Sequence, residues 1–255
     1  MITDSFDDKS PAILNPQTRD NRPKADVCIL TFSHEIERHV LENYACEEIA
    51  SLLSATGRTP VYAIRRGGKT IAFYKTYVGA PITVGLAEDA AAELDCRKFI
   101  LFGGAGCLNK EIAHGRVMVP TAAYRDEGTS YHYAPAAAYI PVKNAEAVAS
   151  CMQANGIPFA TGKTWTTDAI YRETKNNFEK RKAEGCISVE MECAGMQAMC
   201  DFRGLELYAF FTSGDLLDAP EWDSRHTEGE KTGTQHDAGH FDIALALADF
   251  VADRT

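Results

Sequence analysis

The sequence predicts a single α/β domain with helices on both faces of a β-sheet. Apolar runs of strand length alternate with segments of helical periodicity along most of the chain. A length of 255 residues lies within the range of one such domain, and 45% hydrophobic residues are too many for a disordered chain. There is no internal repeat and no long linker, so we expect one domain over residues 26–255, preceded by a polar extension over residues 1–25.

The domain is expected to begin with a buried strand and a long helix. Residues 26–32 read Asp-Val-Cys-Ile-Leu-Thr-Phe, a short run of strand-forming apolar residues. Residues 34–54 carry apolar side chains at helical spacing. Gly57 and Pro60 then interrupt the pattern, which marks the end of this predicted helix.

A predicted hairpin, a helix and a buried strand follow. Residues 61–64 and 70–77 are apolar runs on either side of Arg-Arg-Gly-Gly-Lys, which indicates a β-hairpin with a basic turn. Residues 81–94 are rich in alanine and acidic side chains, and predict a helix. Residues 99–102 form a buried strand that is expected to end in a glycine turn at residues 103–106.

The remaining elements follow the same two patterns. We expect strands at residues 116–123 and 205–212, helices at 145–156 and 241–251, and a polar loop at 219–239. Residues 187–191 are apolar and carry glutamates, and they pass into a predicted helix that ends near Gly204.

Composition excludes several classes of protein. No apolar run approaches the roughly 20 residues that cross a bilayer, which excludes a membrane protein. Residues 1–25 lack the basic start and apolar centre of a secretory signal, and the eight cysteines do not suggest a disulfide framework in a chain this long. We therefore expect a cytoplasmic location. The net charge of −10 argues against nucleic-acid binding, but a local basic pocket could still hold a small anion.

Two glutamates in an apolar run are the first candidate for a functional site. Glu190 and Glu192 are two residues apart, so in extended geometry they share one face. Burying a carboxylate unpaired is costly, whereas two sugar hydroxyls would offset that cost with charge-assisted hydrogen bonds. The alternative is that one glutamate caps the following helix and the other is solvated. We favour a function for this pair.

Two further candidates follow predicted strands. The glycines Gly103, Gly104 and Gly106 would let backbone N–H groups approach an anion, although they could equally form a structural turn. Asp215 follows the strand at 205–212, where its carboxyl group could form a hydrogen bond to a heterocycle or protonate it. A helix cap or an Asx-turn would equally explain an aspartate at this position. In α/β sheets, ligands bind beyond the carboxyl ends of strands.

Two polar stretches are candidate site loops. Residues 166–174 combine hydroxyls, an aromatic ring, acids and Arg172, which could reach a ligand or belong to a solvated turn. Residues 124–133 are too rich in polar and aromatic groups to be plain core, and could line a site or an interface. No spacing supports a metal site, because His236 and His240 lack matching partners. The sequence also contains no nucleophile elbow and no Walker-type phosphate loop.

Three of these stretches together resemble the nucleoside phosphorylase I superfamily, and most closely its uridine phosphorylase branch. They are Phe-Gly-Gly-Ala-Gly at 102–106 with Gly-Arg-Val at 115–117, Arg-Asp-Glu-Gly-Thr-Ser-Tyr-His-Tyr-Ala-Pro at 125–135, and Val-Glu-Met-Glu at 189–192. Their order and spacing match the family, and the similarity extends over about residues 26–250.

The resemblance implies a three-layer αβα domain around a distorted mixed sheet, and an enzyme that cleaves the N-glycosidic bond of a nucleoside with phosphate. The products would be a free base and a pentose 1-phosphate. Nucleoside and phosphate would be the only small-molecule partners, without a further cofactor. The resemblance also implies a homodimer, or a hexamer built from dimers, in which a neighbour completes each site.

The resemblance also implies roles for particular residues. Glu192 would grip the ribose hydroxyls beside Glu190, and Met191 would pack on the sugar. Gly103 and Gly104 would border the phosphate pocket, while Ile170 to Arg172 would border the base. A carboxylate near the sugar would stabilise the positive charge that develops as the base departs, and Asp215 or Arg172 could supply a proton to that base.

The chain departs from the family pattern where phosphate would bind. Phosphorolytic members usually carry an arginine just before the glycine segment and another in a loop after the first strand, where this sequence has Leu101-Phe102 and residues 31–34 without arginine. In the late motif Gly214 follows the serine and Asp215 comes one position later. Replacement cations would be Arg58, Arg65, Arg66 or Lys75, from the same chain or across a dimer contact. Phosphorolysis is the leading hypothesis. The alternatives are hydrolysis on the same scaffold and a nucleoside-binding protein without turnover.

Overall fold

The computed structural model describes residues 1–55, 57–112, 116–218 and 233–254, with the backbone alone for residues 233–238. The described strands are β1 Val27–Thr31, β2 Cys46–Ser54, β3 Gly57–Arg66, β4 Lys69–Lys75, β5 Lys98–Cys107, β6 Val117–Asp126, β7 Tyr139–Pro141, β8 Phe159–Thr167, β9 Cys186–Glu190 and β10 Glu206–Leu216. The helices are α1 His34–Asn43, α2 Ala80–Leu94, α3 Ala145–Ala154, α4 Lys175–Ala183, α5 Cys193–Arg203 and α6 Gly233–Ala252. Short 3-10 turns are η1 Ile2–Asp4, η2 Lys110–Ile112, η3 Thr129–His132 and η4 Ile170–Arg172.

One mixed sheet of ten strands organises the molecule, and part of it closes into a barrel. Its order is β10-β6-β8-β9-β5-β1-β4-β3-β2, and a further pairing of β10 with β5 joins the first five strands into a ring. Parallel and antiparallel pairs both occur: β5 is parallel to β1 and β10 but antiparallel to β9. The predicted α/β class and the distorted mixed sheet are therefore confirmed.

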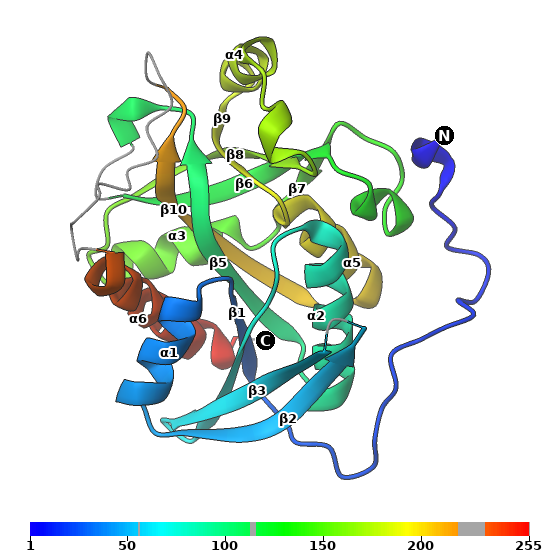
Figure 1. Cartoon of the computed structure of the whole chain (residues 1–255), viewed down its shortest axis with the longest axis vertical. Helices are drawn as coiled ribbons and strands as arrows, with labels where there is room; N and C mark the ends of the chain where they lie inside the picture. Colours follow the sequence, from blue (N-terminus) through cyan, green and yellow to red (C-terminus); the bar gives the residue numbers. More distant parts are fainter. Residues whose placement is uncertain (56, 113–115, 219–232, 255) are drawn as a thin grey trace.

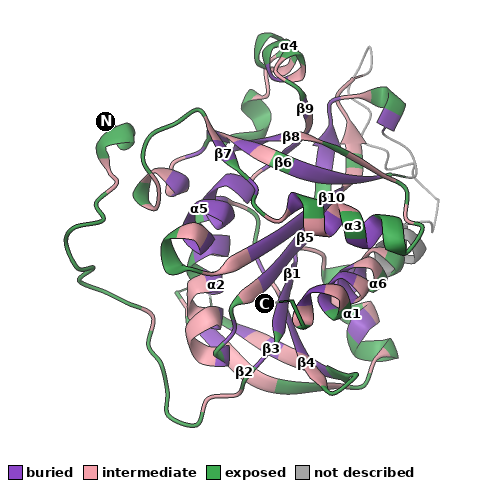
Figure 2. Ribbon diagram, turned by 180° about the vertical axis from the view of Figure 1, so that it is seen from behind, coloured by how far each residue is buried: buried purple, intermediate pink, exposed green. Residues whose placement is uncertain are grey.

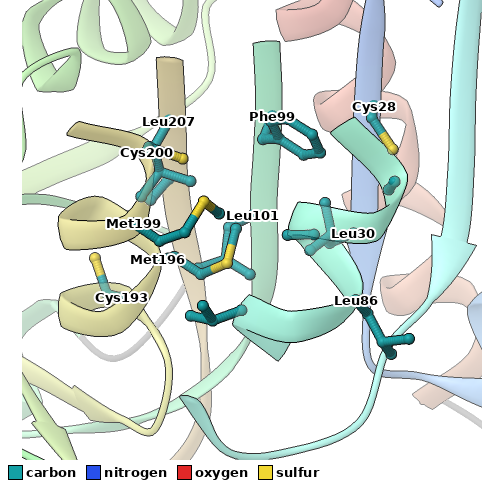
Figure 3. Packing of buried hydrophobic residues seen from close by; sticks show 14 of the residues in the cluster. Cys28, Leu30, Leu86, Phe99, Leu101, Cys193, Met196, Met199, Cys200 and Leu207 are labelled. Atoms are coloured by element: carbon teal, nitrogen blue, oxygen red, sulfur yellow. The ribbon is translucent and has the colours of Figure 1, made fainter. Parts of the chain in front are cut away.

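Helices cover both faces of this sheet (Figure 1), and a hydrophobic core lies on each side. Helices α2 and α5 pack on one face, where Leu30, Leu101 and Met196 belong to one cluster of buried residues. Helices α1, α3 and α6 cover the other face, around Phe102 and Phe210. Figure 2 shows that the central strands β1 and β5 are largely buried, whereas exposed residues lie mainly on the outer helices and loops. In Figure 3, the side chains of Met196 and Met199 of α5 extend toward the strand that carries Leu101.

The predicted long helix at residues 34–54 is wrong in its second half. The helix ends at Asn43, and Cys46–Ser54 form β2. Strand β2 pairs with β3, from Cys46 opposite Ile64 to Ser54 opposite Gly57. Ile49 and Leu52 fit helical spacing but also suit a half-buried strand. The partner strand, which lies beyond the local sequence window, decides between the two structures.

The predicted glycine turn at residues 103–106 is also wrong, because β5 continues through these residues to Cys107. They pair with β10, Gly103 with Phe211 and Gly104 with Thr212. Strand β8 and helix α4 were not predicted, since threonines and charged residues dominate their sequences. The expected loop at 219–239 lies partly outside the described residues, and its last residues, from Gly233, are in α6.

The hairpin and the helix after it are confirmed as β3, β4 and α2, and the helix of residues 145–156 as α3. The polar extension runs along the outside of the domain in Figure 1. Arg22 and Arg19 hold it there through ion pairs with Asp95 and Glu93. None of the described helices has the length and apolarity needed to cross a bilayer.

Candidate active site

Glu190 ends β9 in a dense set of hydrogen bonds. Its carboxylate accepts bonds from the hydroxyl of Thr166 at 2.5 Å and, more weakly, of Thr164 at 3.3 Å. It also accepts the backbone N–H groups of Glu192 at 2.8 Å and Cys193 at 2.6 Å. These N–H groups lie at the start of α5, where a helix has no internal acceptors for them and favours negative charge. Glu190 thereby ties β8, β9 and α5 together.

Glu192 stands at the N-cap position of α5 and is 5% exposed. One carboxylate oxygen accepts the N–H of Gly79 at 2.6 Å, and the other accepts the N–H of Met191 at 3.2 Å. Gly79 has a positive φ of 110° and is the N-cap of α2, a conformation that a residue with a Cβ rarely adopts. The carboxylate of Glu192 therefore lies between the beginnings of α2 and α5.

Burial and mutual repulsion act on both carboxyl groups. Burial raises the pKa of Glu190, and the hydrogen bonds from Thr166 and the α5 backbone oppose this rise. Burial also raises the pKa of Glu192, and the charge of Glu190 raises it further. Because Glu190 accepts more hydrogen bonds, we assign the negative charge first to Glu190 and the strongly raised pKa to Glu192.

The glycine-bearing part of β5 lies beside this carboxylate pair. Gly106 pairs with Val189 in the antiparallel β5–β9 ladder, so residues after Val189 run back in the direction of Gly104 and Gly103. On the other side of β5, Asp215 of β10 pairs with Gly106, and its carboxylate lies 3.2 Å from where a Cβ on Gly106 would stand. The sheet thus gathers the predicted residues from β5, β9 and β10.

The segment predicted to border the base lies at the surface. Ile170 is 54% exposed and Arg172 is exposed, both in η4, which begins three residues after β8 ends. The next residue, Glu173, is half-buried. Burial, and then the charge of Asp215, raises the pKa of Glu173 to about 7. Glu173 therefore lies close enough to Asp215 for the charge of Asp215 to raise its pKa.

The loop after β6 is held by an internal network. Arg125 is buried, donates to the Ser130 hydroxyl at 2.7 Å and to the carbonyl oxygen of Pro135 at 2.6 Å, and lies over the Tyr131 ring. Gly128 donates its N–H to Asp168, the residue after β8. In the described structure this arginine shapes the loop.

A groove of about 750 Å³ lies away from the carboxylate pair, between the N-terminal extension and helices α2 and α5. Its walls include Leu14, Glu88, Tyr133 and Arg203. The N-terminal extension forms part of the wall of this groove, whereas the predicted site residues of β5, β9 and β10 meet at the carboxylate pair. We therefore place the candidate site at Glu190 and Glu192. No group of three potential metal ligands occurs among the described residues.

Several residues of this site were not predicted from the sequence. Gly79 is separated from Glu192 by 113 residues, and no local pattern joins them. Thr166 and Glu173 fall within the polar stretch that was noted, but nothing in its spacing distinguishes them from their neighbours. Phe32, which packs against Gly103, was predicted only as the last residue of the first strand.

Comparison with known proteins identifies the family to which this fold belongs. Residues 27–246 match the model of the phosphorylase superfamily, so the chain belongs to that superfamily. It is 27% identical to uridine phosphorylase of Escherichia coli (strain K12) over 185 residues, which cover 66% of this chain and 72% of that protein.

Purine enzymes are similar at comparable levels. A purine nucleoside phosphorylase of the DeoD type from Exiguobacterium sp. is 24% identical over 187 residues, covering 71% of this chain and 74% of that protein. Another from Bacillus velezensis is 25% identical over 214 residues, covering 81% and 84%. The relatives thus include both pyrimidine and purine phosphorylases.

Proposed function

We propose that this chain cleaves the N-glycosidic bond of a nucleoside. The observation that carries the proposal is the buried carboxylate of Glu192, bonded to the N–H groups of Gly79 and Met191. No cation pairs with it among the described residues. Two adjacent pentose hydroxyls would supply the charge-assisted hydrogen bonds that make such burial favourable.

The mechanism follows from the bond that is broken. As the base departs, positive charge develops on the sugar carbon, and Glu192 in its ionised form stabilises that charge. The departing base needs a proton or must leave as an anion. Asp215 lies near the end of β10, and its charge acts on Glu173, which follows β8. A carboxyl group with a pKa of about 7, such as that of Glu173, is a suitable donor near neutral pH.

Glu190 has a different task in this proposal. Its carboxylate bonds to Thr166 and to the start of α5, so we propose that it positions Glu192. Met191 lies between the two carboxylates and is proposed to contact the sugar, while Ile170 and Arg172 are proposed to cover the base. Gly103 and Gly104 are still proposed to border the place where phosphate or water would approach the sugar.

The identity of the acceptor is a separate question. The resemblance and the names of the relatives support phosphate, which would yield a pentose 1-phosphate. A second candidate is hydrolysis, and the observation that favours it is the contact of Phe32 with Gly103. A homodimer or a hexamer of dimers, and a cytoplasmic location, remain predictions from the sequence.

A direct assay tests the proposed function. The purified chain is incubated with purine and pyrimidine nucleosides, with and without phosphate, and free base is measured by chromatography. Release of base from at least one nucleoside supports the proposal. Tight nucleoside binding without any release would instead support a binding protein without turnover and would overturn it.

A further inference from the structure

Helices α2 and α5 and the turn η3 meet at a first point beside Glu192. A Cβ built on Gly195, in the first turn of α5, would lie 2.9 Å from the Cβ of Ala80 and 3.6 Å from the Cβ of Thr129. Ala80 begins α2 and Thr129 begins η3, so the starts of all three elements are in contact here. Contacts between apolar atoms have no preferred direction, so these alone would allow α2 to slide along α5.

The same three elements meet at a second point, around the carboxylate of Glu88 in α2. One of its oxygens lies 2.7 Å from Nε and 2.6 Å from Nη2 of Arg203, the last residue of α5. The other oxygen accepts a hydrogen bond at 2.8 Å from the hydroxyl of Tyr133, which directly follows η3. We call Glu88, Arg203 and Tyr133 the clamp. Its charge-assisted hydrogen bonds are directional, so the clamp fixes the position of α2 along α5.

The N-terminal extension covers this clamp from the outside. Phe6 packs edge-on against Phe202 with ring centroids 6.5 Å apart, and Phe202 packs in the same way against Tyr133 at 5.8 Å. The first turn of the chain, η1, lies beside η3 (Figure 1). All three clamp residues line the groove of about 750 Å³ that the extension borders. Residues 1–26 lie outside the part that matches the superfamily model, so the family gives the extension no role.

We propose that Glu88 is a positioning residue of the sugar site and that the N-terminal extension holds it in place. This inference rests on the proposed function. Gly79 precedes Glu88 by about 13 Å along the axis of α2. The position of α2 on α5 places the N–H of Gly79 2.6 Å from the carboxylate of Glu192. Movement of α2 by about 1 Å away from Glu192 would break this bond. Glu88 therefore acts on the sugar through Gly79 and Glu192.

The first test measures the bond between Gly79 and Glu192 and needs no activity. Amide hydrogen exchange of the full chain is followed by NMR in the wild type and in Glu88→Ala. We expect the Gly79 N–H to exchange at least about tenfold faster in the variant, with the amides of β1 and β5 still protected. Glu88→Gln, which keeps the volume of the side chain, is compared in the same way if Glu88→Ala does not fold.

Asp89→Ala is the matched control for this test. It removes the neighbouring carboxylate of α2, which lies outside the clamp, and the Gly79 N–H should exchange as in the wild type. Equal exchange of this N–H in the Glu88 variant and the wild type would overturn the inference, whatever the activity of the chain.

The second test separates positioning from a general loss of stability through the pH dependence of base release. The bond from Gly79 lowers the pKa of Glu192, whereas burial and the charge of Glu190 raise it. Losing that bond raises the pKa further, so less Glu192 is ionised at low pH. We expect the fall in kcat/KM of Glu88→Ala to be at least about threefold larger at pH 6 than at pH 9.

The outcomes of this second test are distinct. An equal fall in kcat/KM at both pH values would indicate a merely structural role and overturn the assignment of Glu88 as a positioning residue. Failure of the wild type to release base from any nucleoside would overturn the proposed function, and the exchange of the Gly79 N–H would still decide whether the clamp holds α2.

A double-mutant cycle tests the part played by the extension. Phe6→Ala removes the ring that covers Phe202, and we expect the Gly79 N–H to exchange about threefold faster or more. In the Glu88→Ala background the same change should have no further effect, because the clamp is already open. Ile13→Ala, which removes an exposed side chain of the extension, is the control and should change nothing. No effect of Phe6→Ala in the wild type, or an undiminished effect in Glu88→Ala, would show that the extension does not act through the clamp.

Discussion

Two glutamates separated by one residue have different surroundings, and the difference assigns them different tasks. The carboxylate of Glu190 is enclosed by hydroxyl and backbone donors, so little of it is left for a ligand. Glu192 accepts two backbone N–H groups and has further accepting capacity on both oxygens. The spacing in the sequence identified the pair, but only the contacts with Thr166 and Gly79 separate a positioning group from a ligand-binding group.

The raised pKa of Glu192 predicts a pH-dependent gain in stability for Glu192→Gln. Because the folded-state pKa lies above that of the unfolded chain, the folded protein retains the proton to higher pH, and stability falls as pH rises from the ordinary glutamate range toward neutrality. The variant lacks this penalty. We expect its melting temperature to exceed that of the wild type by about 3 °C or more at pH 8, and the difference to shrink at pH 5. An equal difference at both pH values would contradict the assignment.

The contact between Phe32 and Gly103 predicts a coupled pair of mutations. Gly103→Ala should lower the free energy of unfolding by about 1–3 kcal/mol, because its methyl group would meet the ring at 2.9 Å. In a Phe32→Ala background the same change should cost much less. Gly85→Ala, in α2 with open space around its Cβ position, is the control and should stabilise by about 1 kcal/mol. Additive effects at residues 32 and 103, measured by denaturant unfolding, would rule out the contact.

At the scale of elements, the sequence was most informative where local pattern and tertiary partner agree. The hairpin β3–β4 and helix α2 were predicted because turn residues and apolar periodicity specify them. The apolar spacing of Cys46–Ser54 fits the period of a helix as well as that of a strand, and these residues were predicted as helix. Their pairing with β3 makes them a strand. The glycines of β5 were interpreted as a turn, but they let Phe32, Val189 and Leu217 approach the strand closely.

The close approach of α5 and α2 predicts another coupled pair. A Cβ on Gly195 would lie 2.9 Å from the Cβ of Ala80, so Gly195→Ala should push the helices apart. This movement would weaken the bond from Gly79 to Glu192, and we expect base release and melting temperature to fall together. The compensating swap Gly195→Ala/Ala80→Gly should recover both. If Gly195→Ala alone is as stable and active as the wild type, the spacing of these helices does not control the site.

At the scale of the whole molecule, the closed part of the sheet explains why the site could be predicted only in part. Strands β5, β10, β6, β8 and β9 form the ring, so residues far apart in the chain meet at the glutamate pair. The sequence supplied the motifs and their order. It could not supply contacts such as that between Gly79 and Glu192, because these depend on how the sheet closes and where α2 begins.

The dense cores on both faces predict that the thiols are protected. None of the eight cysteines, all of which lie in the described part of the chain, forms a disulfide; seven are buried and Cys46 is half-buried. Burial also raises the pKa of buried thiols such as those of Cys28, Cys193 and Cys200, so little of their thiolate form is present at neutral pH. A thiol-reactive dye should therefore label about one cysteine rapidly in the folded protein and all eight in denaturant. Rapid labelling of several cysteines in the folded protein would contradict the packing.

The most direct test of the central claim is the rate of base release by Glu192→Ala. The account predicts that the wild type releases free base from a nucleoside and that Glu192→Ala loses this turnover by about a hundredfold or more, with a single cooperative melting transition retained. Glu42→Ala, which removes an exposed carboxylate in α1, should leave the rate unchanged. A rate for Glu192→Ala equal to that of the wild type would contradict the claim that this buried carboxylate holds the sugar.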